Sequence, residues 1–407
     1  MQEASQRGAK ENRMDYLKRT WAEIDLDALE HNYHIIRTAA QPCAKICCVV
    51  KADAYGHGVP MAAQVYERLG ADWFAVSNLE EAIQLRRCGI AKPVLILGYT
   101  PPSLAAELAA SGISQSVLSL EYANALSSCA ENAGVTVKIH LKVDTGMSRI
   151  GFLYQNPQRD FAAIEEMEAA CRLPGLYPEG IFTHFAVSDE GYGGEAFTRQ
   201  QFACFQQAFE ALKCRGISIP LRHCANSGAV GDYPEYHLDM VRPGIILYGL
   251  HPSGKVHKPL DLRPAMELKT VVSMVKEVEA ETSVSYGRTF VTQQATRIAT
   301  VPIGYADGYP RAFSDRAEML VRGRRVPVVG RVCMDQLMLD VSGVPDVREG
   351  DVVTVFGKDG GAFLPVDELA ALNETIHYEM VCLVGKRVPR IYLRGGKTVG
   401  QLNYICP

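Results

Sequence analysis

The chain has 407 residues, of which 47% are hydrophobic and 22% charged, the composition of an ordinary globular protein. Its 42 basic and 46 acidic side chains give a net charge of −4 without a long block of either sign. Nucleic acid and anionic membranes are therefore not expected partners, and no apolar run is long enough to span a membrane.

The N-terminus and the cysteines favour a cytoplasmic protein. Residues 1–13 lack the apolar segment of a secretion signal, and we predict a polar arm over residues 1–20. The 12 cysteines are scattered, without the spacing of a zinc site, so we interpret them as reduced thiols and expect no metal. At this length two domains are the natural expectation.

Strand and helix patterns alternate after the arm. Residues 21–25 read as a short strand, followed by a helix that Asp25 or Asp27 would cap. Eight strands are then predicted at residues 46–50, 73–76, 93–97, 114–118, 135–143, 180–185, 221–224 and 240–245. Helical periodicity is found between most of them, at residues 61–69, 79–87, 103–110, 121–130, 160–172 and 198–213.

This alternation favours an α/β fold, a (β/α)8 TIM barrel over residues 21–260. An open doubly wound sheet is the alternative. From residue 261 to residue 407 the pattern changes to short alternating segments between Gly, Asp and Pro turns, which predicts a second, mostly β-strand domain. Its strands are expected at residues 269–278, 297–302, 326–332, 338–341 and 351–356.

Lys51 stands at the end of the first of the eight strands. The run 46–50 has no polar alternation, which suits a strand buried on both faces, and Ala-Asp-Ala-Tyr-Gly-His-Gly follows the lysine. In barrel enzymes the carboxyl ends of the strands carry the chemistry, and a lysine amine can bond covalently to a carbonyl ligand. Taken alone, a lysine at the end of a strand more often extends its ammonium group into water than serves a function.

Two further strand ends carry basic side chains. Lys142 lies in an apolar strand and is followed by Asp144 and Arg149. A buried lysine is costly unless it is paired or modified, and an ion pair with Asp144 is the simpler interpretation. His184 ends the next strand, where a lone histidine is more often a hydrogen-bonded core residue than a catalyst.

The last two barrel strands are expected to end in small and polar residues. Asn226 and Ser227 follow the seventh strand, and Arg242, Gly244 and Ile245 lie in the eighth. Backbone amides at this place in a barrel predict a phosphate site. A guanidinium on a buried strand is expected to face a ligand atom or a neighbouring side chain.

The second domain carries polar turns. Tyr286 and Tyr305 lie beside glycines, and Met334 and Tyr378 lie in short polar segments. Each turn, taken singly, is compatible with ordinary surface turn chemistry.

Together and in this order, the motifs resemble the signature of the alanine racemase family, from Trp21 to Tyr392. The stretch Val-Val-Lys-Ala-Asp-Ala-Tyr-Gly-His-Gly, which holds Lys51 and Tyr55, is similar to that family's pyridoxal 5′-phosphate (PLP) lysine motif. The resemblance implies a (β/α)8 barrel, a C-terminal β domain and a head-to-tail homodimer. Each active site would take the barrel of one subunit and the β domain of the other.

The resemblance also implies a role for each residue. Lys51 matches the lysine that bonds PLP, and Tyr286 matches the second base, which the family takes from the partner subunit. Lys142 matches a lysine that is usually carbamylated, whose negative charge would hold Arg149. The remaining matches are Arg149 and the Met334 amide for the substrate carboxylate; Tyr55, Ser227, Gly244, Ile245 and Tyr378 for the cofactor phosphate; His184 and Asn226 beside it; Arg242 at the pyridine nitrogen; and Tyr305 at the mouth of the active-site channel.

The implied activity is the interconversion of L-alanine and D-alanine, which supplies D-alanine for bacterial peptidoglycan. A racemase needs a base on each face of its amino acid substrate, and Lys51 and Tyr286 would be these bases. A guanidinium cannot give up its proton, so Arg242 would leave PLP a weaker electron sink than a carboxylate partner would.

Three other activities compete with this interpretation. In a serine racemase of the glycopeptide-resistance type, relatives tend to replace the tyrosine that this chain keeps at Tyr378. A non-catalytic PLP-binding barrel protein would lose Tyr286, and a PLP decarboxylase of related fold carries a different second-domain signature. One departure from the family pattern is Ser148, where many members have glycine.

Overall fold

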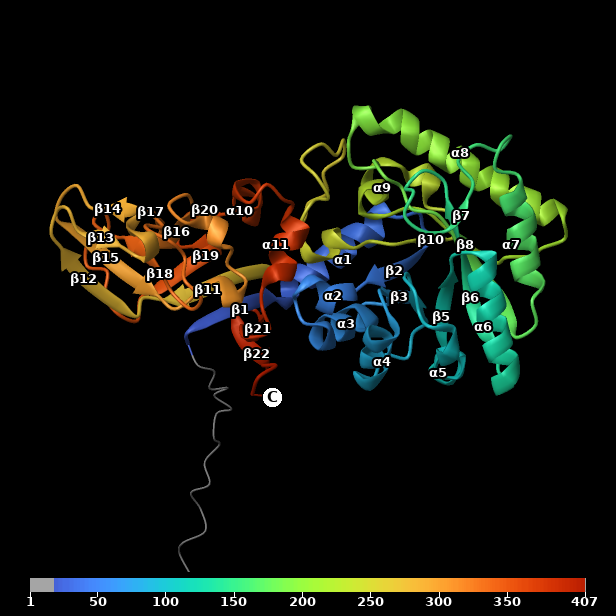
Figure 1. Ribbon diagram of the computed structural model, residues 1–407, viewed down its shortest axis with the longest axis horizontal. Helices are drawn as coiled ribbons and strands as arrows, with labels where there is room; N and C mark the ends of the chain where they lie inside the picture. The colour runs from blue at the N-terminus through green and yellow to red at the C-terminus, as the bar shows by residue number, and fades with distance from the viewer. Residues whose placement is uncertain (1–17, 407) are drawn as a thin grey trace, which may run out of the picture. The chain divides into compact units, whose positions relative to one another are not determined.

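The computed structural model describes residues 18–406, which form two compact units (Figure 1). One unit is Ala28–Pro264, and the other combines the chain up to Asp27 with Ala265 onward. The predicted arm at residues 1–20 lies almost wholly outside the described residues. Within those residues, every helix is too short or too polar to cross a membrane.

The first unit is built on a parallel sheet that nearly closes on itself, which confirms the predicted barrel. Its order, β10-β2-β3-β4-β5-β6-β8-β9, follows the chain and returns the last strand to the first. An open doubly wound sheet would reverse direction at a switch point, so that alternative is wrong. The strands are β2 (Lys45–Val49), β3 (Trp73–Val76), β4 (Val94–Ile96), β5 (Ile113–Val117), β6 (Val137–Asp144), β8 (Leu176–Phe182), β9 (Leu221–His223) and β10 (Met240–Val241), with the short β7 (Phe152–Leu153) beside β6.

Backbone hydrogen bonds just outside the strands join β9 to β10. The Asp239 amide donates to the Arg222 carbonyl at 3.1 Å, and the Arg242 amide donates to the Ala225 carbonyl at 2.9 Å. These bonds fix the two chain segments that carry Ser227 and Arg242 against each other.

Helices alternate with the strands and flank them in Figure 1. Side-chain caps start three of them, because Asn78 accepts from the Glu81 amide, Ser119 from the Tyr122 amide and Asn226 from the Ala229 amide. The helices are α1 (Leu26–Ala39), α3 (Val59–Arg68), α4 (Leu79–Arg87), α5 (Ala105–Ala110), α6 (Leu120–Ala133), α7 (Ala162–Arg172), α8 (Tyr192–Cys214) and α9 (Ser227–Asp232).

The second unit consists mainly of strands, as predicted. Its largest sheet runs β17-β16-β19-β11-β1-β21-β22, with β20 beside β19, and two small sheets are β12-β15-β18 and β13-β14. The elements are β1 (Thr20–Asp25), β11 (Met266–Val271), β12 (Met274–Val278), β13 (Ser283–Val284), β14 (Phe290–Val291), β15 (Thr296–Val301), β16 (Glu318–Val321), β17 (Arg324–Pro327), β18 (Leu337–Asp340), β19 (Val352–Asp359), β20 (Ala362–Leu364), α10 (Val366–Leu372), α11 (His377–Leu383), β21 (Arg390–Arg394) and β22 (Lys397–Leu402).

Two predictions about this unit need correction. The sequence analysis placed residues 21–25 at the start of the barrel domain, but β1 pairs antiparallel with β11 and parallel with β21. The single strand predicted at residues 269–278 is two strands in different sheets. The chain changes sheets between them because the Val272 amide donates to the Asp351 carbonyl while the next amide, Ser273, donates to the Thr300 carbonyl.

Candidate active site

The chain leaves β2 through a left-handed turn that begins at Lys51. Figure 1 labels this turn α2 (Lys51–Tyr55), but Ala52, Asp53 and Ala54 have φ of 51°, 56° and 55°, and Tyr55 has φ of 52°. Each such residue costs roughly 1–2 kcal/mol relative to a right-handed helix. Strain concentrated in one turn persists only where surrounding contacts stabilise it, and such turns cluster at functional sites.

A carboxylate on α4 stabilises this turn. Glu81 Oε1 accepts from the Ala52 amide at 2.8 Å, and Oε2 accepts from the Ser77 amide at 2.7 Å. The turn is also closed by the Ala54 amide, which donates to the Val50 carbonyl at 2.9 Å. Glu81 could not be recognised from the sequence, because it lies 30 positions after Lys51 in a different helix.

Tyr55, Ser227 and Gly244 converge in the barrel unit. The Gly244 amide donates to Ser227 Oγ at 2.8 Å, and a Cβ atom placed on Gly244 would lie 2.7 Å from Tyr55 Oη. The Tyr55 ring packs on Tyr248, whose hydroxyl donates to the Val49 carbonyl at the end of β2. The hydroxyls of Tyr55 and Ser227, together with the backbone amides of Gly244 and Ile245, form a cradle of the kind that binds phosphate.

Filling the cradle should weaken cofactor binding. In Gly244→Ala the new methyl group would displace Tyr55, and an overpacking cost of about 1–3 kcal/mol corresponds to a roughly 10- to 100-fold rise in the Kd for PLP. The measurement is titration of the cofactor-free protein with PLP, followed by absorbance. Gly193→Ala is the matched control, since nothing lies within 4 Å of a Cβ atom there; equal affinities in the two variants would contradict the cradle.

Arg242 is buried, with 3% of its surface exposed, and lies beside the same cradle. Its Nη1 donates to His223 Nδ1 at 2.9 Å, and its Nη2 donates to the carbonyls of Thr183 and Cys224 at 2.8 and 3.1 Å. His184 Nδ1 lies 3.4 Å from Nη2. No residue in the described part of the chain accepts from Nε, so this donor is available to a ligand.

The electrostatics of the pocket centre on His184. Burial lowers the pKa of His184 well below its usual value, and the nearby charges of Arg242, Lys142 and Arg149 lower it further. His184 is therefore neutral at physiological pH. Lys51 lowers this pKa as well, so His184 lies in a region of positive potential, which favours an anionic ligand.

Lys142 is buried without a counter-ion. Its Nζ donates to the Val143 carbonyl at 2.9 Å and lies 5.5 Å from the centre of the Phe182 ring. The predicted ion pair with Asp144 is not formed. Asp144 Oδ1 instead accepts from the amides of residues 146, 147 and 148 at 3.0 Å each. Among the described residues no carboxylate pairs with Lys142, and burial lowers its pKa to about 7.

The loop that Asp144 holds leads to Arg149, which is exposed. Ser148 has φ of 54°, a left-handed conformation that explains why glycine suits this position. The serine is accommodated by a hydrogen bond from Gln155 Nε2 to Ser148 Oγ at 2.9 Å.

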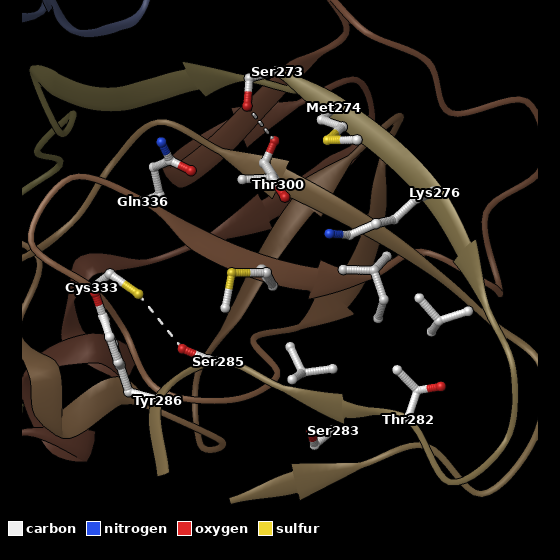
Figure 2. Close-up of a pocket in the computed structure, with 14 residues that line it drawn as sticks. Ser273, Met274, Lys276, Thr282, Ser283, Ser285, Tyr286, Thr300, Cys333 and Gln336 are labelled. Carbon is white, nitrogen blue, oxygen red and sulfur yellow. Dashed lines mark hydrogen bonds between the residues drawn. The ribbon is translucent and has the colours of Figure 1, made fainter. Parts of the chain in front are cut away.

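Tyr286 lies in the second unit, in the loop between β13 and β14, and is 68% exposed. It borders a hollow of about 730 Å³, where Figure 2 shows it beside Ser285 and Cys333. Ser285 Oγ donates to the Arg331 carbonyl at 2.6 Å, which fixes the backbone before the tyrosine. The Tyr286 side chain is therefore exposed on a loop that a hydrogen bond of the preceding residue holds in place.

Met334 and Tyr305 lie on loops that are hydrogen-bonded to each other. The Tyr305 amide donates to the Cys333 carbonyl at 3.1 Å, and the Ala306 amide donates to the Met334 carbonyl at 3.0 Å. Within residues 18–406 nothing accepts from the Met334 amide. The side chains of Met334 and Tyr305 are 53% and 44% exposed, so with Tyr286 they form an exposed cluster in one unit.

The remaining predicted residues are distributed between the two units. Asn226 caps α9 by accepting from the Ala229 amide, and it also accepts from Ser188 Oγ at 2.8 Å. Ile245 is fully buried at the start of a short turn after Gly244. Tyr378 belongs to α11 in the second unit, where its ring lies 5.1 Å from His377.

These groups are typical of a class of protein: a barrel protein that binds a phosphorylated cofactor such as PLP at the carboxyl ends of its strands. The donors fit the cofactor, since the cradle suits a phosphate and Arg242 Nε–H suits a ring nitrogen. The family is identified by matches of the sequence to two protein-family models. The alanine racemase N-terminal domain matches residues 24–252, and the alanine racemase C-terminal domain matches residues 265–392.

Individual relatives agree with these matches. An alanine racemase of Desulfovibrio desulfuricans is 50% identical over 92% of this chain and 98% of its own length. Alanine racemase 2 of Caldanaerobacter subterraneus is 46% identical over 96% and 99%. The solved alanine racemase of Bacillus anthracis with bound L-Ala-P superposes with a TM-score of 0.89 at 36% identity, covering 96% of this chain and 99% of that one.

The chain therefore belongs to the alanine racemase family. It is a PLP-dependent isomerase that racemises alanine, as the resemblance of its motifs implied. The assignment of individual residues to roles stays a prediction.

Proposed function

We propose that this enzyme interconverts L-alanine and D-alanine with two bases, Lys51 on one face of the substrate and Tyr286 on the other. The observation that supports this most directly is the contrast between the two residues. Lys51 begins a strained turn inside the barrel unit, while Tyr286 is held 68% exposed on the surface of the other unit. A tyrosine so exposed and so braced suits a task outside its own unit.

The cofactor would be held by the residues that the resemblance of the motifs assigns to it. Tyr55, Ser227, Gly244, Ile245 and Tyr378 would bind its phosphate, His184 and Asn226 would lie beside them, and Arg242 would donate to the ring nitrogen from Nε. When bound, PLP supplies the electron sink that allows a Cα proton to leave. The chain's own contribution is to hold the amino acid and to move that proton.

The substrate carboxylate would bind to Arg149 and to the Met334 amide. Tyr305, on the loop hydrogen-bonded to that of Met334, would line the entrance. The exposed cluster of Tyr286, Tyr305 and Met334 would then be covered by the barrel of a second copy in a head-to-tail homodimer. Large exposed apolar side chains that lie together often mark a protein interface.

Lys142 would carry a carbamate. Its neutral amine attacks the carbon of CO2, an N–C bond forms, one C–O π bond opens, and a proton passes from nitrogen to water. A cation without a counter-ion is thereby replaced by an anion that can pair with Arg149. A lowered pKa favours this reaction because only the neutral amine is nucleophilic.

The carbamate can be detected directly. With 13C-bicarbonate, the protein should give one carbamate resonance that grows as pH rises through about 7, since the Lys142 amine loses its proton there. Lys138→Met, which removes a half-exposed lysine of the same strand, should keep this resonance, and Lys142→Gln should lose it. A resonance that persists in Lys142→Gln would place the modification elsewhere.

Exchange of the Cα proton tests the activity itself. In D2O, both enantiomers of alanine should incorporate deuterium and interconvert, and L-serine should react more slowly. The closest alternative is a serine racemase, and clear turnover of serine without turnover of alanine would favour it. Peptidoglycan synthesis in the cytoplasm is the expected use of the D-alanine.

A further inference from the structure

We propose that Glu179 is a positioning residue for Arg242, which it orients across the barrel interior through His140 and His223. The carboxylate lies on β8 and the guanidinium just after β10, and the two histidines between them lie on β6 and β9. The functional consequence rests on the role proposed for Arg242, but the chain of hydrogen bonds does not.

Two of the three links are hydrogen bonds, and the third is a longer polar contact. Arg242 Nη1 lies 2.9 Å from His223 Nδ1, and His223 Nε2 lies 2.9 Å from His140 Nδ1. His140 Nε2 lies 3.5 Å from Glu179 Oε2, a longer contact, and no other described residue accepts from this nitrogen. Both histidines are fully buried, so water does not substitute for these partners.

The direction of each hydrogen bond between Arg242 and Glu179 follows from which groups can donate. A guanidinium can only donate, so His223 Nδ1 must be the acceptor. Burial lowers the pKa of His223 and of His140, so each ring is neutral and carries one proton. That proton lies on Nε2 of His223, which donates to His140 Nδ1, and then on Nε2 of His140, which points to Glu179.

The carboxylate end is fixed as an anion. Glu179 accepts from Ser114 Oγ at 2.5 Å and pairs with Lys138 Nζ at 3.1 Å. Burial raises the pKa of Glu179, but the hydrogen bonds from His140, Ser114 and Lys138 lower it to about 2. A carboxylate anion can only accept a hydrogen bond, so the stable tautomer of His140 is the one with its proton on Nε2.

Backbone and ring contacts show that the site is built for these histidines. A Cβ atom on Gly180 would lie 2.3 Å from His140 Nδ1, so only glycine at this position leaves room for the imidazole. His223 stacks on Phe182 with ring centres 4.9 Å apart, and His140 meets Trp73 edge to face at 5.4 Å. The two imidazole rings are thereby held in place between Arg242 and Glu179; we call this series of contacts, from Arg242 through His223 and His140 to Glu179, the relay.

These hydrogen bonds fix the orientation of Arg242. One Nη1–H is bound to His223 and the two Nη2–H groups are bound to the carbonyls of Thr183 and Cys224, so Nε–H and the second Nη1–H remain for a ligand. If the acceptor at Glu179 were lost, reversing both tautomers would satisfy His140. The reversed chain would then put a His223 Nδ1–H against an Arg242 N–H, and the guanidinium would turn away.

The test uses the holoenzyme with 15N-labelled histidine and three variants. Glu179→Leu removes the acceptor, Glu179→Gln restores an acceptor oxygen without charge, and Lys138→Met removes another partner of the carboxylate. Solid-state 15N NMR reports the tautomers, and His140→Asn and His223→Asn identify the two resonances. The steady-state constants for alanine are measured on the same samples.

In the wild type we expect both histidines with the proton on Nε2. Glu179→Leu should show a mixture of tautomers and a kcat lowered about 10-fold with little change in KM, as for other residues that orient a group in contact with the cofactor. Glu179→Gln and Lys138→Met should resemble the wild type. The absorption maximum of the bound cofactor should shift in Glu179→Leu alone.

Three results would overturn the inference: an Nδ1–H tautomer or a charged ring in the wild type, unchanged tautomers in Glu179→Leu, or changed tautomers without any change in kcat and absorption. The third would leave the racemase activity itself intact. Failure of the wild-type enzyme to turn over alanine would instead contradict the proposed function, and the tautomer measurement would still decide the relay.

Discussion

Tyr286→Phe is expected to lower alanine racemisation about 10²- to 10⁴-fold, the contribution typical of a positioned acid or base. The loss should be equal in both directions, because the two enantiomers have equal free energies and a catalyst cannot change that ratio. Folding should not be affected, since the side chain is 68% exposed and only its hydroxyl is removed.

Isotope exchange separates the two faces, which racemisation rates cannot do. In D2O, Tyr286→Phe should still exchange the Cα proton of D-alanine with retention, because Lys51 is intact, while exchange of L-alanine should be nearly abolished. Tyr192→Phe is the matched control, since that tyrosine is 85% exposed on α8 and should behave as the wild type. Equal loss of exchange from both enantiomers would contradict the assignment of one base to each face.

The barrel could be predicted because its strands are buried runs with clear ends. The strand expected at residues 73–76 is β3 (Trp73–Val76), and the one expected at residues 46–50 is β2 (Lys45–Val49), one residue earlier. A parallel strand needs apolar residues on both faces, so composition alone marks it. The order of the strands followed from the alternation with helices.

Partners distant in sequence could not be predicted in the same way. The pattern of residues 21–25 shows a strand but not that it pairs with β11 and β21. The use of Asp144 by loop amides, which leaves Lys142 without a counter-ion, is a property of the backbone and not of either side chain. His140 and His223 are 83 residues apart, so their contact depends on two strands meeting in the barrel.

The left-handed turn at Lys51 was also beyond sequence reasoning, because three of its residues are Ala52, Asp53 and Ala54, none of which favours positive φ as glycine does. It is stabilised by the hydrogen bonds that Glu81 accepts and by the bond from the Ala54 amide to the Val50 carbonyl. The candidate catalytic residues were found through the resemblance, since each motif taken alone is compatible with an ordinary structural role.

The second large effect is expected from the proposal that the two bases of one active site come from two subunits. Lys51→Ala and Tyr286→Phe should each be almost inactive as homodimers. Co-expressed in equal amounts, they should form mixed dimers in half of all pairings. In such a dimer one site receives both substitutions and the other receives none, so the mixture should recover about one quarter of the wild-type activity.

This recovery distinguishes a shared site from a site within one subunit. If Lys51 and Tyr286 of the same chain acted together, every subunit in the mixture would carry one defect and activity would stay near zero. Separately purified variants mixed without subunit exchange are the control and should remain inactive. The exposure of Tyr286, Tyr305 and Met334 is compatible with the proposed shared site, because large exposed apolar side chains often mark a protein interface.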